Sequence, residues 1–372
     1  MLIVFIVCCL AVFFTYLGAK GQLKNGLGIA FFVLTAFFSI RYMYGNDYMG
    51  YLEFFKEIAH FPSFGSFLDS YTSSKAFLLS EFGWGTLNYL FKPLGFPFLV
   101  AFLTIFEYII YFKLIKTYVP KEYQWMAVYT LVLNPQILIL QLSMMRQALA
   151  IVLLILTTHY ILTEKRLLAI LCAVIAISVH KSALIVLPVF ILAFSYKQIG
   201  SLRLKKFLPI ILIAIYVILL MSKDYISGLF MLSFDNDIVS NYSQYENRME
   251  SSEFSIGLGF LFTLIPFILL LRYLWIKKDN TSINLFVFFA ALGYALAPLS
   301  YVESLLDRLI FYFSVFTIVA IPFAYYSLRD KVLRISLIGI YVLITVYSYY
   351  SFMTSPTWVK GFSTYHTLLD IL

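Results

Sequence analysis

Apolar and polar residues alternate along the 372-residue chain in long blocks. Nearly uninterrupted apolar runs are separated by short polar connections, without the spacing of a half-buried helix or the two-residue alternation of a strand. Such runs predict helices that span a membrane, because a spanning strand has to alternate. About twelve spans are expected, over residues 2–18, 26–44, 95–113, 123–141, 146–162, 167–180, 182–196, 207–222, 255–275, 282–300, 308–327 and 333–352.

Composition sets the class of protein. Hydrophobic residues make up 62% of the chain and charged residues 12%, against about 45–50% and about 25% in soluble domains. No soluble core of this size encloses so much apolar surface, so we predict an all-α, polytopic integral membrane protein. A single transmembrane domain is expected over residues 1–372. The first run has no basic stretch before it and no small-residue cleavage site after it, so it is predicted to be a retained span.

Lysine and arginine in the short connections predict the orientation of the spans. With Lys20 and Lys24 placed in the cytoplasm, the inside holds 17 basic and 4 acidic residues, a net charge of +13. The outside then holds 10 basic and 14 acidic residues, a net charge of −4, and Glu107 lies within a span. Both termini are expected outside. The overall charge of +8 therefore follows from topology and does not indicate a nucleic-acid partner.

Residues 167–196 are predicted to form two short helices. A single tilted helix would place Lys181 in the middle of the membrane, at a cost of about 2.5–3.5 kcal/mol. Two helices that meet at His180-Lys181 avoid this, and their turn would lie below the outer surface, where irregular backbone is tolerated only beside a wet cavity. Earlier in the chain, Asn134-Pro135 is expected to bend a helix.

Two outer segments are longer than a connection needs. Residues 45–94 carry acids and many aromatics, and they are expected to contain interfacial or re-entrant helices that end at Lys92-Pro93. Residues 223–254 form an outer loop of about 30 residues, a length typical of lids, binding loops or disordered segments.

Charged residues gather at helix ends on the predicted outer face, which indicates an outward-facing cavity. Arg41, Arg146 and Arg308 are candidates for binding a diphosphate, because arginine is permanently charged and forms paired hydrogen bonds. The alternative for each is a snorkelling interfacial residue or a structural ion pair. For Arg308, such a pair would involve Glu303 or Asp307.

A proton acceptor is also available on this face. His180 titrates near neutral pH and is able to accept or donate a proton, although a lone histidine is more often structural. Asp47 and Glu81 are the carboxylates placed to deprotonate or orient a sugar hydroxyl, with a solvated loop acid as the alternative. Lys181 would assist a phosphate.

Aromatic residues are 19% of the chain, and most are expected to face lipid or fill the core. Tyr48, Tyr51 and Tyr245 lie beside outer charges and are candidates for stacking on sugars. The three cysteines lie inside apolar runs, without the spacing of metal ligands. Neither a metal nor a cofactor is expected.

Four stretches form an ordered series of motifs. Arg41 with Gly45-Asn46-Asp47-Tyr48 and Tyr51 forms R-x3-G-N-D-Y-x2-Y, and the other three stretches are Glu81-Phe82-Gly83, Arg146-Gln147-Ala148-Leu149-Ala150 and His180-Lys181-Ser182-Ala183-Leu184. In order and spacing, from about residue 41 to about residue 320, the chain resembles EpsG-like and Wzy-like polysaccharide polymerases. Arg308 begins a helix as a late arginine does in that group. The family usually has threonine where this chain has Asn46.

This resemblance implies a glycosyltransferase of the C type (GT-C) with an outward-facing cavity, which uses neither a nucleotide sugar nor a metal. It implies a polymerase that joins undecaprenyl-diphosphate-linked oligosaccharide repeats into O-antigen, capsule or exopolysaccharide at the outer face of a bacterial inner membrane. The expected partners are this lipid-linked oligosaccharide as donor and acceptor, membrane lipid and a chain-length regulator protein. Arg146, with Arg308 and Arg41, would bind the donor diphosphate, and Asp47 or His180 would activate the acceptor hydroxyl.

Two other functions stay open on the sequence alone. An O-antigen ligase, or another transferase of lipid-linked sugars, would show the same layout of charges and differ only in its product. A flippase for the lipid-linked repeat would tend to show repeat symmetry and polar sites near the midplane. This chain has no obvious repeat, and its polar residues gather at one face.

Overall fold

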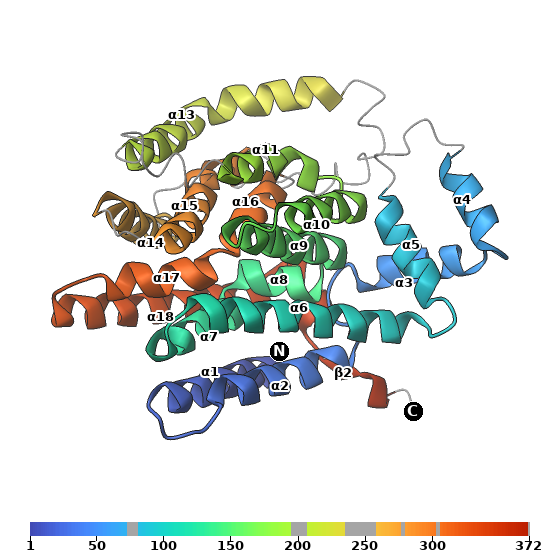
Figure 1. The fold of residues 1–372 in the computed structure, drawn as a ribbon, viewed down its shortest axis with the longest axis horizontal. Coiled ribbons are helices and arrows are strands. Elements are labelled where there is room, and N and C mark those ends of the chain that lie inside the picture. Colours follow the sequence, from blue (N-terminus) through green and yellow to red (C-terminus); the bar gives the residue numbers. More distant parts are fainter. Residues whose placement is uncertain (73–80, 195–206, 235–257, 277–279, 303–305, 371–372) are drawn as a thin grey trace. The chain divides into compact units, whose positions relative to one another are not determined.

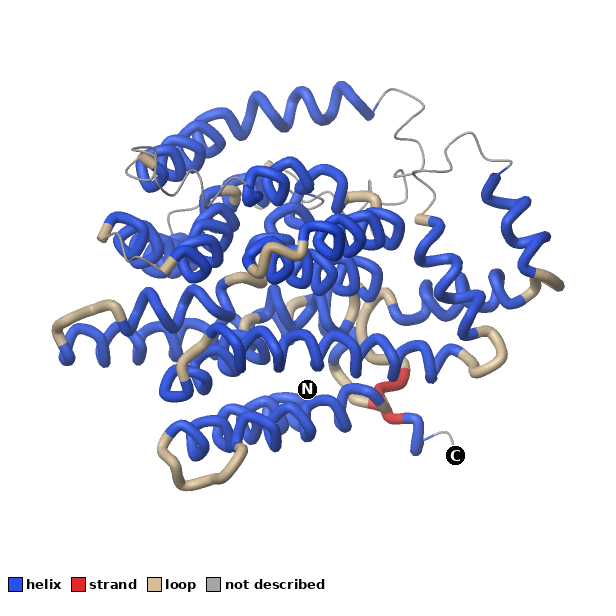
Figure 2. The backbone as a smooth tube through the Cα atoms, in the orientation of Figure 1, coloured by secondary structure: helices blue, strands red, loops and turns tan. Residues whose placement is uncertain are grey.

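The computed structural model describes residues 1–72, 81–194, 207–234, 258–276, 280–302 and 306–370, which are almost entirely helical (Figures 1 and 2). The chain divides into two compact units, which we describe separately. The first unit comprises Met1–Phe194 and Ile335–Leu372, and the second comprises Ser195–Arg334.

The first unit contains the N-terminal helices and the C-terminal segment. Its elements are α1 (Leu2–Ala19), α2 (Gly26–Ser39), β1 (Arg41–Tyr42), α3 (Tyr48–Ala59), α4 (Phe64–Thr72), α5 (Phe82–Phe91), α6 (Phe96–Tyr118), the 3-10 helix η2 (Lys121–Tyr123), α7 (Gln124–Leu133), α8 (Pro135–Leu142), α9 (Met145–Leu162), α10 (Arg166–Val179), α11 (Ala183–Phe194), most of α18 (Lys331–Thr354), α19 (Pro356–Phe362), β2 (His366–Thr367) and the 3-10 helix η7 (Leu368–Asp370).

The second unit is built from the helices between these parts. Its described elements are α13 (Leu208–Phe234), α14 (Leu258–Trp275), α15 (Thr281–Ala295), the 3-10 helix η5 (Ala297–Tyr301), α16 (Asp307–Ser314) and α17 (Thr317–Tyr326). Helix α15 packs against α14, α16 and α17.

Each predicted span falls mainly on a helix or on consecutive helices of the described chain, but the predicted span 26–44 is too long, because α2 ends at Ser39 and β1 follows. By length and composition, six helices in the described part of the chain are able to cross a membrane, or up to eight if each bent pair counts as one span. Helices α2, α10 and α11 are shorter apolar helices, and so is the described stretch Thr263–Trp275 of α14. Multiple apolar helices and an all-helical fold are thus confirmed, whereas twelve crossings stay a prediction.

Local sequence explains only some of the breaks between consecutive helices of a predicted span. The helices on either side of Asn134 meet at 63°, as expected for Asn-Pro, because proline removes a helical hydrogen bond. Helix α10 ends at Val179 and α11 begins at Ala183, which confirms two helices meeting near His180. The predicted span 308–327 is instead a pair, α16 and α17, bent by 59° without a proline at the break.

The two outer segments contain more helix than a loop would. Residues 45–94 include α3, α4 and α5, so the predicted helices are present, and α5 ends at Phe91, directly before Lys92-Pro93. Helix α13 continues to Phe234, so residues 223–234 of the predicted loop are helical. The remainder, residues 235–254, lies outside the described residues.

Helix α9 is the centre of the first unit, since it packs against α6, α8, α10 and α11. In the same unit, α1 packs against α2 and α7 (Figure 1). At one end of this unit, β1 and β2 form a two-stranded antiparallel sheet, drawn in red in Figure 2. The amine of Met1 donates a hydrogen bond to the carbonyl oxygen of Ser363 at 3.0 Å. The N-terminus therefore bonds to the C-terminal segment, and that segment pairs with the Arg41 stretch. The side of the membrane on which the termini lie stays a prediction.

Candidate functional site

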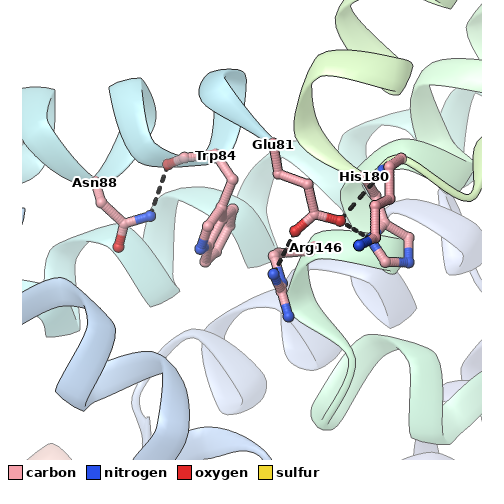
Figure 3. Close-up of polar contacts among 6 residues, drawn as sticks. Glu81, Trp84, Asn88, Arg146 and His180 are labelled. Carbon is pink, nitrogen blue, oxygen red and sulfur yellow. Dashed lines mark hydrogen bonds and ion pairs between the residues drawn. The ribbon is translucent and has the colours of Figure 1, made fainter. Parts of the chain in front are cut away.

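Glu81 joins the three motif stretches that are far apart in sequence (Figure 3). Its Oε2 atom forms an ion pair with Nη1 of Arg146 at the start of α9. Its Oε1 atom accepts a hydrogen bond from Nδ1 of His180 at 2.7 Å and one from the backbone N–H of Lys181 at 3.2 Å. One carboxylate therefore binds α9 and the turn between α10 and α11 together.

The backbone of Glu81 explains why its side chain is available for this. Glu81 precedes α5 with φ of +52°, in the left-handed region, and its side chain makes no capping bond to its own helix. The first N–H groups of a helix normally attract such a carboxylate, and a left-handed non-glycine residue costs about 1 kcal/mol or more. This conformation persists because the carboxylate has stronger partners in Arg146 and His180.

Gly83 allows α5 to approach α10 closely enough for these contacts. A Cβ atom at Gly83 would lie 2.3 Å from Oγ and 2.9 Å from the backbone carbonyl carbon of Ser178. Ser178 lies two residues before His180, in the last turn of α10. The glycine of the Glu81-Phe82-Gly83 motif is therefore required by close helix packing and not by a turn.

Among the side chains that contact the Glu81 carboxylate, that of Arg146 is the most exposed. Its side chain is 38% exposed, against 10% for that of Glu81. The guanidinium carbon lies 5.5 Å from the centre of the Tyr51 ring, a cation–π contact, and the Tyr51 ring in turn packs edge-on against Trp84 at 5.4 Å. Tyr51 thus supports Arg146 from one side while Glu81 binds it from another.

The Arg41–Tyr51 stretch packs against the start of α9. Gly45 has φ of +112°, and a Cβ there would lie 2.4 Å from the carbonyl oxygen of Leu142, so this position needs glycine. The backbone N–H of Asp47 donates to Oγ of Ser143 at 3.2 Å. Burial raises the pKa of the Tyr51 hydroxyl, and the nearby negative charge of Asp47 raises it further. The structure therefore brings Asp47 and Tyr51 to the same region as Arg146.

The C-terminal segment holds this stretch in place. The side-chain amide of Asn46 donates to the carbonyl oxygen of Thr357 at 2.9 Å, and the N–H of Gly45 donates to that of Gly361 at 3.0 Å. A Cβ at Gly361 would lie 2.0 Å from Oδ1 of Asn46. The side-chain amide of Asn46 therefore fixes this stretch to the C-terminal segment.

Arg41 lies inside the first unit. It is 2% exposed, and its Nη1 donates to Oγ1 of Thr104 at 2.5 Å and to the carbonyl oxygen of Phe38 at 2.9 Å. Its Nη2 donates to the carbonyl oxygen of Gln141 at 3.2 Å. These contacts join the end of α2 to α6 and α8. The structure thus places Arg41 in a helix-joining position, and its diphosphate role stays a prediction.

The remaining candidates lie elsewhere. Tyr48 is fully buried, with its ring against those of Tyr42 and Phe96. Arg308 belongs to α16 in the second unit, which is described by itself. Tyr245 and Glu303 lie outside the described residues.

Electrostatics fix the protonation of the Glu81 carboxyl. Burial alone raises its pKa, but the hydrogen bond from His180 and the positive charge of Arg146 outweigh burial and lower the pKa from 4.5 to about 2. An ionised carboxylate only accepts hydrogen bonds, so Nδ1 of His180 carries the proton. In the neutral ring, the lone pair is then on Nε2.

Sequence reasoning named these residues but missed how they pair. It treated Glu81, Arg146 and His180 as separate candidates, and it did not foresee that Tyr51 lies against Arg146. Ser143 and Gln141 were also missed, although both are polar residues in an apolar stretch just before Arg146. In the described part of the chain, no group of three or more His, Cys, Asp or Glu residues is placed to hold a metal ion.

Fold and site define a helical membrane protein with a charged cluster at the end of one unit. The chain belongs to the EpsG family, whose model matches residues 24–367, and this is the family of Wzy-like polysaccharide polymerases. No curated protein and no solved structure matches the chain.

Proposed function

We propose that this protein joins lipid-diphosphate-linked oligosaccharide repeat units, carried on undecaprenyl, into a polysaccharide at the outer face of the bacterial inner membrane. The observation that carries this proposal is the Glu81 carboxylate, which binds a partly exposed arginine and a histidine from separate helices. A cation and a proton acceptor in contact with one carboxylate are what transfer from a diphosphate leaving group requires.

Arg146 is the residue we assign to the donor diphosphate. It occupies the first turn of α9, where the helix macrodipole also favours an anion. A diphosphate would compete with Glu81 for the guanidinium, and the exposed part of Arg146 is where that competition begins. Lys181, whose side chain is exposed at the α10–α11 turn, supplies further positive charge in this proposal. The diphosphate role of Arg308, in the second unit, stays a prediction.

His180 is the residue we assign to the acceptor hydroxyl. The hydroxyl oxygen of the acceptor sugar attacks the anomeric carbon of the donor, and the bond between that carbon and the diphosphate oxygen breaks. The lipid diphosphate leaves with the electron pair of that bond, and the hydroxyl proton passes to Nε2 of His180. Glu81 stabilises the imidazolium that results. Asp47 is the alternative base, because it lies beside Tyr51 near the same end of α9.

Three other residues of the motifs are assigned structural roles that support the site. Tyr51 orients Arg146, Tyr48 fills the core beneath α3, and Arg41 joins α2 to α6 and α8. A chain-length regulator protein remains an expected partner of the polymer product.

The test is the glycan of a deletion strain complemented with single variants. Arg146→Ala is expected to reduce polymer by about 10²-fold or more, and His180→Ala by about 10²-fold, at normal protein levels. Arg166→Ala, at an exposed arginine that begins α10, is the matched control and is expected to keep the full ladder of repeat lengths. An unchanged ladder in Arg146→Ala would contradict the proposal. Full-length polymer that accumulates unattached in the deletion strain would instead identify a ligase.

A further inference from the structure

A cavity lies between α6 and α9, far from the Glu81 cluster. It has a volume of about 170 Å³, room for several water molecules at roughly 30 Å³ each. His159 lines it near the C-terminal end of α9, whereas Arg146 begins the same helix. Thirteen helical steps separate the two residues, or about 20 Å along the axis, so this cavity is separate from the site described above.

The lining of the cavity changes from apolar to polar along both helices. Ile110 of α6 and Ile155 of α9 line the cavity about one turn before Lys113 and His159. Thr117 and Tyr118 follow on α6. Two helices thus turn polar at the same level, which is the arrangement expected where a cavity meets the headgroup region of a membrane.

The polar groups of the cavity suit an anion. The Tyr118 hydroxyl and Nδ1 of His159 are 2.8 Å apart. With the hydroxyl as donor to Nδ1, the ring proton is on Nε2, which leaves the imidazole N–H and the Thr117 hydroxyl as donors for an anion. Lys113 also lines the cavity and brings a positive charge to it. Among the described residues that line the cavity, none is acidic.

An apolar surface continues from the cavity along α6. Ile109 is 46% exposed and Ile105 is 43% exposed, so this helix leaves apolar side chains uncovered in the direction away from Lys113. A phospholipid fits this arrangement, because its phosphate would lie at the basic, donor-rich end and its two acyl chains along the apolar surface. A free phosphate ion would use only the basic end.

We propose that the cavity between α6 and α9 binds the phosphate of an anionic phospholipid. The lipid belongs to the membrane leaflet that lies beside Lys113. Basic cavities between membrane helices recognise such headgroups through lysine, hydroxyl and imidazole donors. The acyl chains lie along Ile105 and Ile109. This assignment does not depend on the proposed polymerase activity.

The test uses the full-length protein in detergent, with bound lipid counted by native mass spectrometry. Phosphatidylglycerol is titrated against wild type, Lys113→Gln and Lys116→Gln. Lys116 is the matched control, because it lies one turn further along α6, does not line the cavity and has its ammonium 5.4 Å from the Phe112 ring centre. We expect Lys113→Gln to weaken binding about fivefold and Lys116→Gln to change it less than about twofold.

Two further arms identify the ligand. Phosphatidylcholine, which carries the same phosphate without net charge, is expected to bind more weakly than phosphatidylglycerol by about tenfold. Inorganic phosphate at millimolar concentration is expected to leave phosphatidylglycerol bound. Equal effects of the two lysine variants, equal binding of the two lipids, or displacement by inorganic phosphate would each overturn the proposal.

Discussion

Two arginines of the same motif series differ in what surrounds them. Arg41 is 2% exposed and donates to two backbone carbonyls and a threonine hydroxyl, whereas the Arg146 side chain is 38% exposed and contacts a carboxylate and an aromatic face. Arginine is the same cation in both places, but only Arg146 presents donors toward the outside of the fold.

Arg41→Gln is therefore expected to reduce the amount of folded protein, since it leaves the Phe38 and Gln141 carbonyls and the Thr104 hydroxyl without their donor. The expected loss of stability is about 1–3 kcal/mol for each acceptor left unsatisfied. Arg146→Gln is expected to lose polymer formation with a smaller loss of folded protein, because Glu81 keeps the hydrogen bonds from His180 and Lys181. Size-exclusion profiles of both variants in detergent measure the amount of folded protein. A normal profile for Arg41→Gln would contradict the structural role and favour substrate binding by Arg41.

Glu81 should also make stability depend on pH. Its folded-state pKa is lowered from 4.5 to about 2 by His180 and Arg146, so its contribution is fully present above about pH 4.5 and is lost as pH falls toward 2. The wild-type melting temperature should fall through that window more steeply than that of Glu81→Gln, which cannot titrate there. Thermal unfolding in detergent from pH 6 to pH 3 measures the difference. Parallel curves would mean that Glu81 is not ionised in this arrangement.

At the scale of elements, helix contacts position the cluster. Helix α5 reaches α10 through Gly83, and the C-terminal segment holds the Arg41 stretch through Asn46 and Gly45. Neither contact involves a chemical group that reacts in the proposed transfer. Both determine where such groups lie.

Gly83→Ala is expected to displace α5 from α10, because a methyl group would overlap Ser178. Overpacking of this kind costs about 1–3 kcal/mol, and a shift of about 1 Å at Glu81 should reduce polymer formation about 10²-fold. Gly50→Ala is the control, since a Cβ there meets nothing within 4 Å. Polymer ladders from the two strains, compared at equal protein levels, provide the measurement. Equal ladders would show that the α5–α10 contact tolerates a methyl group.

Sequence predicted the helices well and their mutual contacts poorly. Hydropathy depends on composition within a run, so the spans, the Asn134-Pro135 bend and the break at His180 were all visible. The pairing of Glu81 with Arg146 depends on close packing between α5 and α10, which no local pattern encodes. The bend between α16 and α17 could not be predicted, because no proline lies at the break. The burial of Arg41 could not be predicted either, because it follows from hydrogen-bond partners on α6 and α8.

At the scale of the whole molecule, the basic residues predict which end faces the cytoplasm. Glu57 on α3 and Lys24 in the α1–α2 connection are both exposed and belong to opposite predicted sides. In a variant without Cys8, Cys9 and Cys172, we expect Glu57→Cys to react with an impermeant maleimide on intact spheroplasts. Lys24→Cys should react only after lysis. The reverse pattern would invert the topology and remove the Glu81 cluster from the outer face.

The bond between Asn46 and Thr357 has a consequence for biogenesis. The two residues are 311 positions apart, and at bacterial rates of roughly 5–20 residues per second the ribosome needs roughly 15–60 seconds to travel between them. During that interval the Arg41 stretch has already been synthesised, but the C-terminal residues that hold it have not. Membrane insertion of the intervening helices must precede completion of this stretch. A nascent chain stalled before Thr357 would thus be inserted but inactive, and its open N-terminal segment would be a natural target for membrane quality-control proteases.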